Sequence, residues 1–131
     1  MQNRSTVTLS EEMEFLESYI RILEIRYDHS FFVEITGREL IGNQHVIPFT
    51  MQLLLENIIK HNRISKQYPM HIRIEIGPQG VAVVNSLRCY RKSDTSSGIG
   101  LTYISRQYGV FGRQVTTTDD GCHFTAKVPY L

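Results

Sequence analysis

The most informative segment of this chain is Leu53-Leu54-Leu55-Glu56-Asn57-Ile58-Ile59-Lys60-His61-Asn62. At about 100° per residue, a helix over these residues separates apolar from polar side chains. The polar arc carries Glu56, Asn57, Lys60 and His61. Such an arc is most often only a solvated face. A carboxylate, a carboxamide, an ammonium and an imidazole within two turns also form a set that can hold a metal ion, balance phosphate charge and move a proton.

The bulk composition is that of an ordinary globular protein. The chain has 131 residues, 41% of them hydrophobic, and a net charge of +1. These values predict a soluble chain with a real core and give no support to nucleic-acid binding. Cys89 and Cys122 have no companion at metal-ligand spacing and are interpreted as free thiols of a reducing cytoplasm. Without a long apolar run or a signal-peptide layout, a cytoplasmic location is expected.

The first helix is expected over residues 10–27. Its apolar residues recur at spacings of four and three: Leu9, Met13, Leu16, Ile20, Leu23 and Tyr27. This heptad stripe indicates a helix that packs on its own domain, or one that also meets a partner helix. Thr8 and Ser10 are both suitable N-cap residues, although Ser10 with Met13 lacks a full capping box.

The remaining elements alternate between helices and strands. Helices are expected over 48–62, with Pro48 in the first turn, and over 98–108, closed by Gly109. Alternating hydrophobicity predicts the strands, at residues 31–36, 71–77, 81–84, 113–118 and 123–128. The last four form two hairpins. The pattern predicts an α+β fold, a two-layer α/β sandwich with helices on one face of a mixed, mainly antiparallel sheet.

A second motif, Ser96-Ser97-Gly98-Ile99-Gly100-Leu101, precedes the last helix. Its glycines allow a ligand to approach the backbone, and a helix N-terminus offers N–H groups to phosphate. Residues 86–97 are polar and long for a connection, so we expect a functional loop that is mobile without ligand. Combined with the polar helix face, this motif predicts a nucleotide site.

These motifs resemble those of a known family. Residues 53–62 resemble the N box of histidine-kinase ATP-binding domains, and residues 96–101 resemble their second glycine box. Residues 7–27 resemble the leading segment of LytS-type sensor kinases, and residues 47–57 are similar to that subfamily as well. The resemblance covers nearly the whole chain.

The resemblance implies the Bergerat fold of gyrase-type ATPases, with ATP and Mg²⁺ as cofactors. It divides the chain into a leading helix, 1–29, and an ATP-binding domain, 30–131. It implies that Asn57 binds magnesium, that Glu56 accepts or orients a proton, and that Lys60 acts on the phosphates. The other nucleotide-binding residues that it implies are His61, Asn62, Asn85, Ser97, Gly98, Ile99, Gly100 and Leu101.

Two departures from the family pattern bear on function. Where the family has an aspartate for the adenine amino group, this chain has Asn85, a weaker acceptor. None of its histidines has the context of the family's phosphoacceptor: His29, His45, His61, His71 and His123. The phosphoacceptor histidine is therefore expected on an upstream segment outside this chain.

The resemblance implies further partners: the upstream phosphoacceptor helix, a response regulator and a second copy bound through the leading helix. It also implies a cytoplasmic domain whose parent protein is anchored in the inner membrane. Two alternatives are a non-catalytic nucleotide-binding or dimerisation module of the same fold, and a serine kinase of the anti-sigma-factor kind. The altered segment at Asn85 and the heptad stripe motivate the first alternative, and only the shared fold motivates the second.

Overall fold

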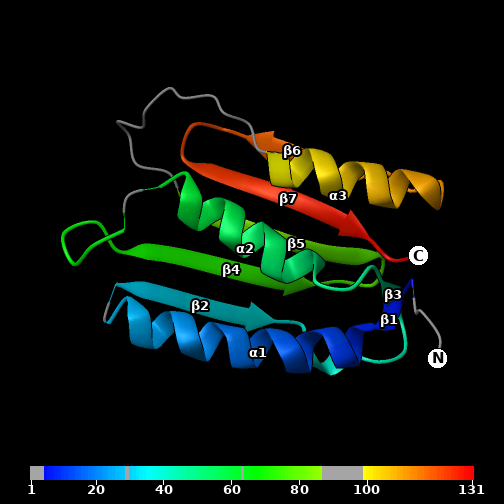
Figure 1. Ribbon diagram of the computed structural model, residues 1–131, viewed down its shortest axis with the longest axis horizontal. Coiled ribbons are helices and arrows are strands. Elements are labelled where there is room, and N and C mark those ends of the chain that lie inside the picture. The colour runs from blue at the N-terminus through cyan, green and yellow to red at the C-terminus, as the bar shows by residue number, and fades with distance from the viewer. Residues whose placement is uncertain (1–4, 29, 63, 87–98) are drawn as a thin grey trace.

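Three helices lie against a five-stranded sheet in this protein (Figure 1). The structure is a computed structural model that describes residues 5–28, 30–62, 64–86 and 99–131. Its helices are α1 (Leu9–Arg26), α2 (Thr50–Lys60) and α3 (Ile99–Val110), with a short 3-10 turn η1 (Arg38–Leu40). Its strands are β1 (Val7–Thr8), β2 (Phe31–Thr36), β3 (His45–Val46), β4 (Met70–Ile76), β5 (Gly80–Ser86), β6 (Thr116–Asp119) and β7 (His123–Pro129).

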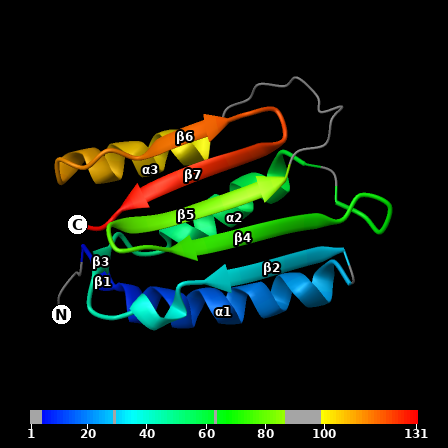
Figure 2. The same ribbon diagram turned by 180° about the vertical axis from the view of Figure 1, so that it is seen from behind.

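The sheet has the strand order β2-β4-β5-β7-β6. The β2–β4 pair is parallel, and the other three pairs are antiparallel. Figure 1 shows α2 and α3 in front of the sheet, and Figure 2 shows the strands in front of both helices. The predicted fold class and both hairpins are therefore confirmed. None of the helices in the described ranges combines the length and apolar character that a bilayer span requires.

The heptad stripe of α1 faces this domain's own core. The stripe residues from Leu9 to Leu23 are at most 7% exposed, and they join the apolar faces of α2 and the sheet in one cluster. In β4 the predicted alternation is confirmed, since Ile72, Ile74 and Ile76 are all buried. Three exposed apolar residues, Phe15, Ile22 and Ile25, lie elsewhere on α1.

Several predicted boundaries were wrong for identifiable reasons. α1 does carry a capping box, but Thr8 and Glu11 form it, and both reciprocal hydrogen bonds are present. α2 begins at Thr50 rather than Pro48 because Phe49 has a φ of 66°, a left-handed conformation that no helix can continue through.

The last helix and the last hairpin also differ from expectation. α3 passes through Gly109 and ends at Val110, and Gly112, with a φ of 72°, is the residue that turns the chain. The Arg113 N–H then donates to the Tyr108 carbonyl at 3.0 Å, so residues 113–115 are not strand. The β1–β3 pair, only two residues long on each side, was not predicted.

The N-terminus of α2 is capped by a residue of another helix. Phe49 offers no side-chain cap of its own. The buried carboxylate of Glu12, on α1, instead accepts the N–H groups of Phe49 at 2.9 Å and Met51 at 3.0 Å. This contact satisfies two N–H groups that a helix start leaves unpaired, and it places negative charge at the positive end of the helix dipole.

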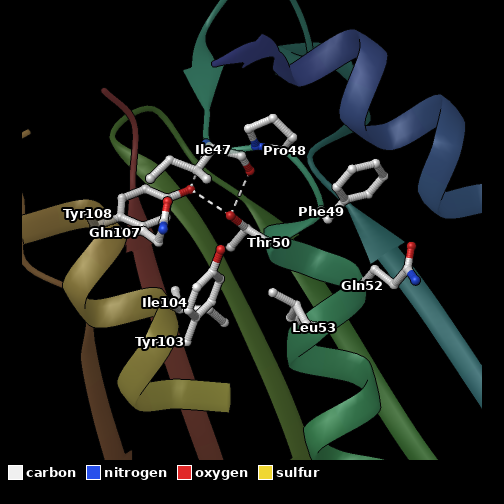
Figure 3. A pocket seen from close by; sticks show the side chains of 10 residues that line it. All are labelled: Ile47, Pro48, Phe49, Thr50, Gln52, Leu53, Tyr103, Ile104, Gln107 and Tyr108. Atoms are coloured by element: carbon white, nitrogen blue, oxygen red, sulfur yellow. Dashed lines mark hydrogen bonds between the residues drawn. The ribbon is translucent and has the colours of Figure 1, made fainter. Parts of the chain in front are cut away.

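Tyr108 ties α3 to the same start of α2 (Figure 3). Its fully buried hydroxyl accepts the N–H of Ile47 at 3.1 Å and lies 3.0 Å from the Thr50 hydroxyl. The Thr50 hydroxyl donates to the Ile47 carbonyl at 2.7 Å, so the Tyr108 hydroxyl is the donor to Thr50. Both neighbouring helices thus fix where α2 begins.

Replacing Glu12 by alanine is expected to destabilise the fold by about 2–4 kcal/mol, because two N–H groups lose their charged acceptor. Glu12→Gln, which keeps one acceptor oxygen, is expected to lose less. Urea unfolding followed by circular dichroism measures both values. Glu14→Ala, on the exposed side of the same helix, is the matched control and should change stability by less than about 0.5 kcal/mol. Equal stability of the Glu12→Ala and Glu14→Ala proteins would contradict the capping role.

The same carboxyl makes stability depend on pH. Burial raises the pKa of Glu12 above its ordinary value of 4.5, against the lowering effect of the N–H groups of Met51, Phe49 and Thr50. The folded chain therefore holds this proton more tightly than the unfolded chain does. The stability of the wild type relative to Glu12→Gln should be greatest below pH 4.5 and fall as the pH rises through the raised pKa. Unfolding curves of both proteins across this range measure the difference, and a difference that grows with pH would refute the expectation.

Candidate functional site

Three elements frame the region of the predicted site. The C-terminal half of α2 and the end of β5 lie toward the same end of the molecule in both views, and α3 begins near the middle, with its first turn on the side of that end (Figures 1 and 2). Helix α2 contacts both β5 and α3. Residues 53–62 of the first motif are therefore on a helix that contacts both the strand of Asn85 and the helix that begins within the second motif.

Asn85 presents a buried acceptor without a partner in the part of the chain that the structure describes. It lies on β5 with Val81 and Val83, on the side that faces the helices, and it is only 2% exposed. Its Nδ2 donates to the Ser86 carbonyl at 3.3 Å, but its buried Oδ1 receives no hydrogen bond from any described residue. An unpaired buried acceptor costs about 1–3 kcal/mol, so this position suits a ligand that brings a donor.

The polar face of α2 is arranged as the sequence predicts. Lys60 and His61 are exposed and Asn57 is half-buried. The ion pair open to Glu56 and Lys60 at their i,i+4 spacing is not formed, and Lys60 pairs with no other carboxylate in the described ranges. The ammonium of Lys60 is therefore available to an anion. The N–H of His61, which ends the helix, donates to the Asn57 carbonyl at 3.2 Å.

The Glu56 carboxylate is held from the side of α1. Its Oε2 accepts the Tyr19 hydroxyl at 3.3 Å and the Gln52 amide at 3.1 Å. Burial and then the charge of Glu56 raise the pKa of Tyr19 to about 12, so this hydroxyl stays protonated as a donor. Neither donor was predicted from the sequence. Gln52 lies four residues before Glu56, a spacing that could have indicated it, whereas nothing in the sequence points to Tyr19.

Asn62 closes α2. Its Nδ2 donates to the Ile58 carbonyl at 2.8 Å, which satisfies one of the last carbonyls of the helix. One of the two N–H donors of this amide is therefore used within the helix end. A ligand at Asn62 would meet its oxygen and its remaining N–H.

The second motif is described in part. Ser97 and Gly98 lie outside the described residues, as do residues 87–96 of the predicted loop. Ile99 and Gly100 form the first turn of α3, where backbone N–H groups have no partner within the helix, and Leu101 packs partly against the core. The expected helix is therefore present, and it begins at Ile99 within the motif.

The described residues contain no group of three or more His, Cys, Asp or Glu side chains that could hold a metal ion by themselves. A metal held through Asn57 would need most of its ligands from a bound anion or from water. Mg²⁺ bound to nucleotide phosphates has this kind of coordination.

A hollow of 290 Å³ lies between the start of α2 and α3 (Figure 3). Its walls include Phe49, Leu53, Tyr103 and Ile104. None of the site residues predicted from the sequence is among the residues that line it. It is therefore separate from the region around Asn57 and Asn85.

Comparison with known proteins gives a consistent result. The chain is 32% identical over 106 residues to the sensor protein kinase HptS of Staphylococcus aureus strain USA300, and equally to that of strain NCTC 8325 / PS 47. The match covers 81% of this chain and 19% of each relative, so the chain spans about one fifth of their length. No family model matches the chain.

Solved structures with the same fold are histidine kinases. The cytoplasmic segment of histidine kinase QseC has a TM-score of 0.64 at 14% identity, covering 100% of this chain and 80% of that one. A nucleotide-free catalytic domain of histidine kinase ThkA has a TM-score of 0.60 at 17% identity, covering 98% of each chain. This chain is therefore homologous to a segment of a sensor histidine kinase, and its fold is that of histidine-kinase catalytic domains.

Proposed function

We propose that this chain is the ATP-binding catalytic domain of a two-component sensor histidine kinase of the LytS type. It binds Mg·ATP and presents the γ-phosphate to a histidine outside this chain. The observation that carries the proposal is the buried Oδ1 of Asn85 at the end of β5, which has no hydrogen-bond partner among the described residues. The homology to sensor kinases supports the same conclusion.

In this proposal Asn85 recognises adenine. Its Oδ1 accepts a hydrogen bond from the exocyclic amino group of the base, which gives the orphaned acceptor its donor. A neutral amide oxygen is a weaker acceptor than the aspartate of the family pattern. The affinity for ATP is accordingly expected to be lower than an aspartate would give.

The phosphates lie against α2 and the start of α3. The side-chain oxygen of Asn57 is a magnesium ligand, and the exposed Lys60 and His61 face the phosphate oxygens. The unpaired N–H groups at the start of α3 bind phosphate, together with Ser97 and Gly98 of the motif before it. When bound, Mg²⁺ neutralises phosphate charge.

Phosphoryl transfer to histidine depends mainly on positioning and charge neutralisation. Lys60 balances the charge that develops on the transferred phosphoryl group, and Glu56 accepts or orients the proton of the attacking histidine. The phosphoacceptor helix and a response regulator are the expected protein partners. A homodimer through α1 would use its exposed side, where Ile22 and Ile25 lie, because the heptad stripe is buried. We place the domain in the cytoplasm, with its parent in the inner membrane.

The presence of Asn85 in place of aspartate favours a second candidate, a degenerate module of the same fold that binds nucleotide without catalysis or only dimerises. Nucleotide affinity and phosphotransfer distinguish the two candidates. A folded chain without measurable Mg·ATP binding would favour a module that only dimerises. Binding without transfer to a supplied phosphoacceptor helix would favour a nucleotide-binding module.

Asn57→Ala is expected to abolish Mg·ATP binding, because the metal loses its protein ligand and the phosphates lose their anchor. Isothermal titration calorimetry of the chain with Mg·ATP measures the effect, and wild-type affinity should fall by about tenfold or more when the metal is chelated. Asn43→Ala, at an exposed position outside the site, is the matched control. Full affinity in the Asn57→Ala protein would rule out the proposed metal site.

Asn85→Leu is expected to weaken ATP binding about tenfold, the loss typical of one hydrogen bond to a buried acceptor. Purine riboside triphosphate, which lacks the amino group, should bind the wild type and the variant with the same affinity. Competition titrations with the two nucleotides measure this difference. An equal loss for both nucleotides would mean that Asn85 shapes the pocket without reading the amino group.

A further inference from the structure

One oxygen of the Glu56 carboxylate is held by two donors from different helices. Tyr19 on α1 and Gln52 on α2 both donate to Oε2, at 3.3 Å and 3.1 Å. Within the described ranges, Oε1 receives no hydrogen bond. A carboxylate anchored through one oxygen keeps its plane and its direction while the other oxygen stays open to a proton.

The Tyr19 hydroxyl has the properties that a fixed donor needs. It is partly buried between α1 and α2, and Glu56 is the acceptor of its hydrogen bond. With a pKa of about 12 it keeps its proton throughout the pH range in which a kinase works. Gln52, one turn before Glu56, holds the same oxygen from its own helix, so two independent anchors define one side-chain conformation.

We propose that Tyr19 is a positioning residue for Glu56 and that Gln52 is the second one, so that the leading helix takes part in the phosphoryl-transfer site. This inference rests on the proposed function, in which Glu56 accepts or orients the proton. Tyr19 touches neither nucleotide nor histidine and acts only through the Glu56 carboxylate. Misplacement of an acceptor by fractions of an ångström lowers the rate of transfer without changing nucleotide binding.

The test is a double-mutant cycle on Tyr19→Phe and Glu56→Gln. Transfer from ATP to the phosphoacceptor histidine is measured in the longer kinase that the proposed function implies, and Mg·ATP affinity in this chain. Tyr19→Phe is expected to lower kcat about five- to tenfold at unchanged affinity, the size expected for one lost orienting hydrogen bond. In the Glu56→Gln protein the same change should have no further effect, because the carboxylate that it positions is gone.

Three further variants extend the cycle. Gln52→Leu removes the other donor and is expected to lower kcat in the same way, and the double variant with Tyr19→Phe should approach Glu56→Gln. Tyr27→Phe makes the same chemical change at the end of α1, at a hydroxyl without a contact to Glu56, and it should keep both kcat and affinity.

The outcomes distinguish failure of the proposed function from failure of the positioning role alone. If the wild type does not bind Mg·ATP, or if Glu56→Gln transfers phosphate at the wild-type rate, the proposed function of the site fails and the positioning role is overturned with it. If Glu56→Gln is inactive while Tyr19→Phe has the wild-type kcat, only the positioning role is overturned. That role is likewise overturned, with the proposed function intact, if Tyr19→Phe slows the Glu56→Gln protein as much as the wild type.

Discussion

The contact between the Glu12 carboxylate and the start of α2 is the constraint on which the candidate site depends. Helix α2 cannot cap itself, because the residue before it is a phenylalanine in a left-handed conformation. Without the two hydrogen bonds that the Glu12 carboxylate accepts, two N–H groups at the helix start would lose their protein acceptor. The positions of the α2 residues Asn57, Lys60 and His61 therefore depend on a residue of another helix. Burying the Glu12 carboxyl costs free energy, which its raised pKa reflects. The stabilisation of the start of α2 offsets this cost.

The general architecture could be predicted from the sequence because it follows local periodicities. The alternation of Ile72, Ile74 and Ile76 predicts a strand buried on one face, and the structure confirms it. The spacing of the α1 stripe predicts a buried helix face, which is confirmed as well. Helix ends were less predictable, because Phe49 and Gly112 determine them through left-handed backbone conformations. A phenylalanine in such a conformation has no sequence signal, and Gly109 was an equally good candidate for the end of α3.

The candidate site was predictable to the extent that it lies on one helix or at one strand end. The face shared by Asn57, Lys60 and His61 follows from helical geometry alone. The burial of Asn85 follows from its alternation with Val81 and Val83 along β5. That its Oδ1 lacks a partner among the described residues does not follow from this alternation, because it depends on which side chains the other elements bring near. The absence of a Glu56–Lys60 pair was unpredictable for the same reason, since a distant tyrosine competes for the carboxylate.

Helix α1 contacts α2 and its N-cap at two points, which are separated by the same number of residues on both sides. Glu12 contacts Phe49 and Tyr19 contacts Glu56, so a step of seven residues along each helix joins the two contacts, and the two helices run in the same direction (Figure 1). Seven residues are about two helical turns, which places both contacts on the same side of α1. A shift of α1 along its axis would therefore disturb the start of α2 and the Glu56 carboxylate together. Because the buried stripe packs α1 against the core, this register is held by packing.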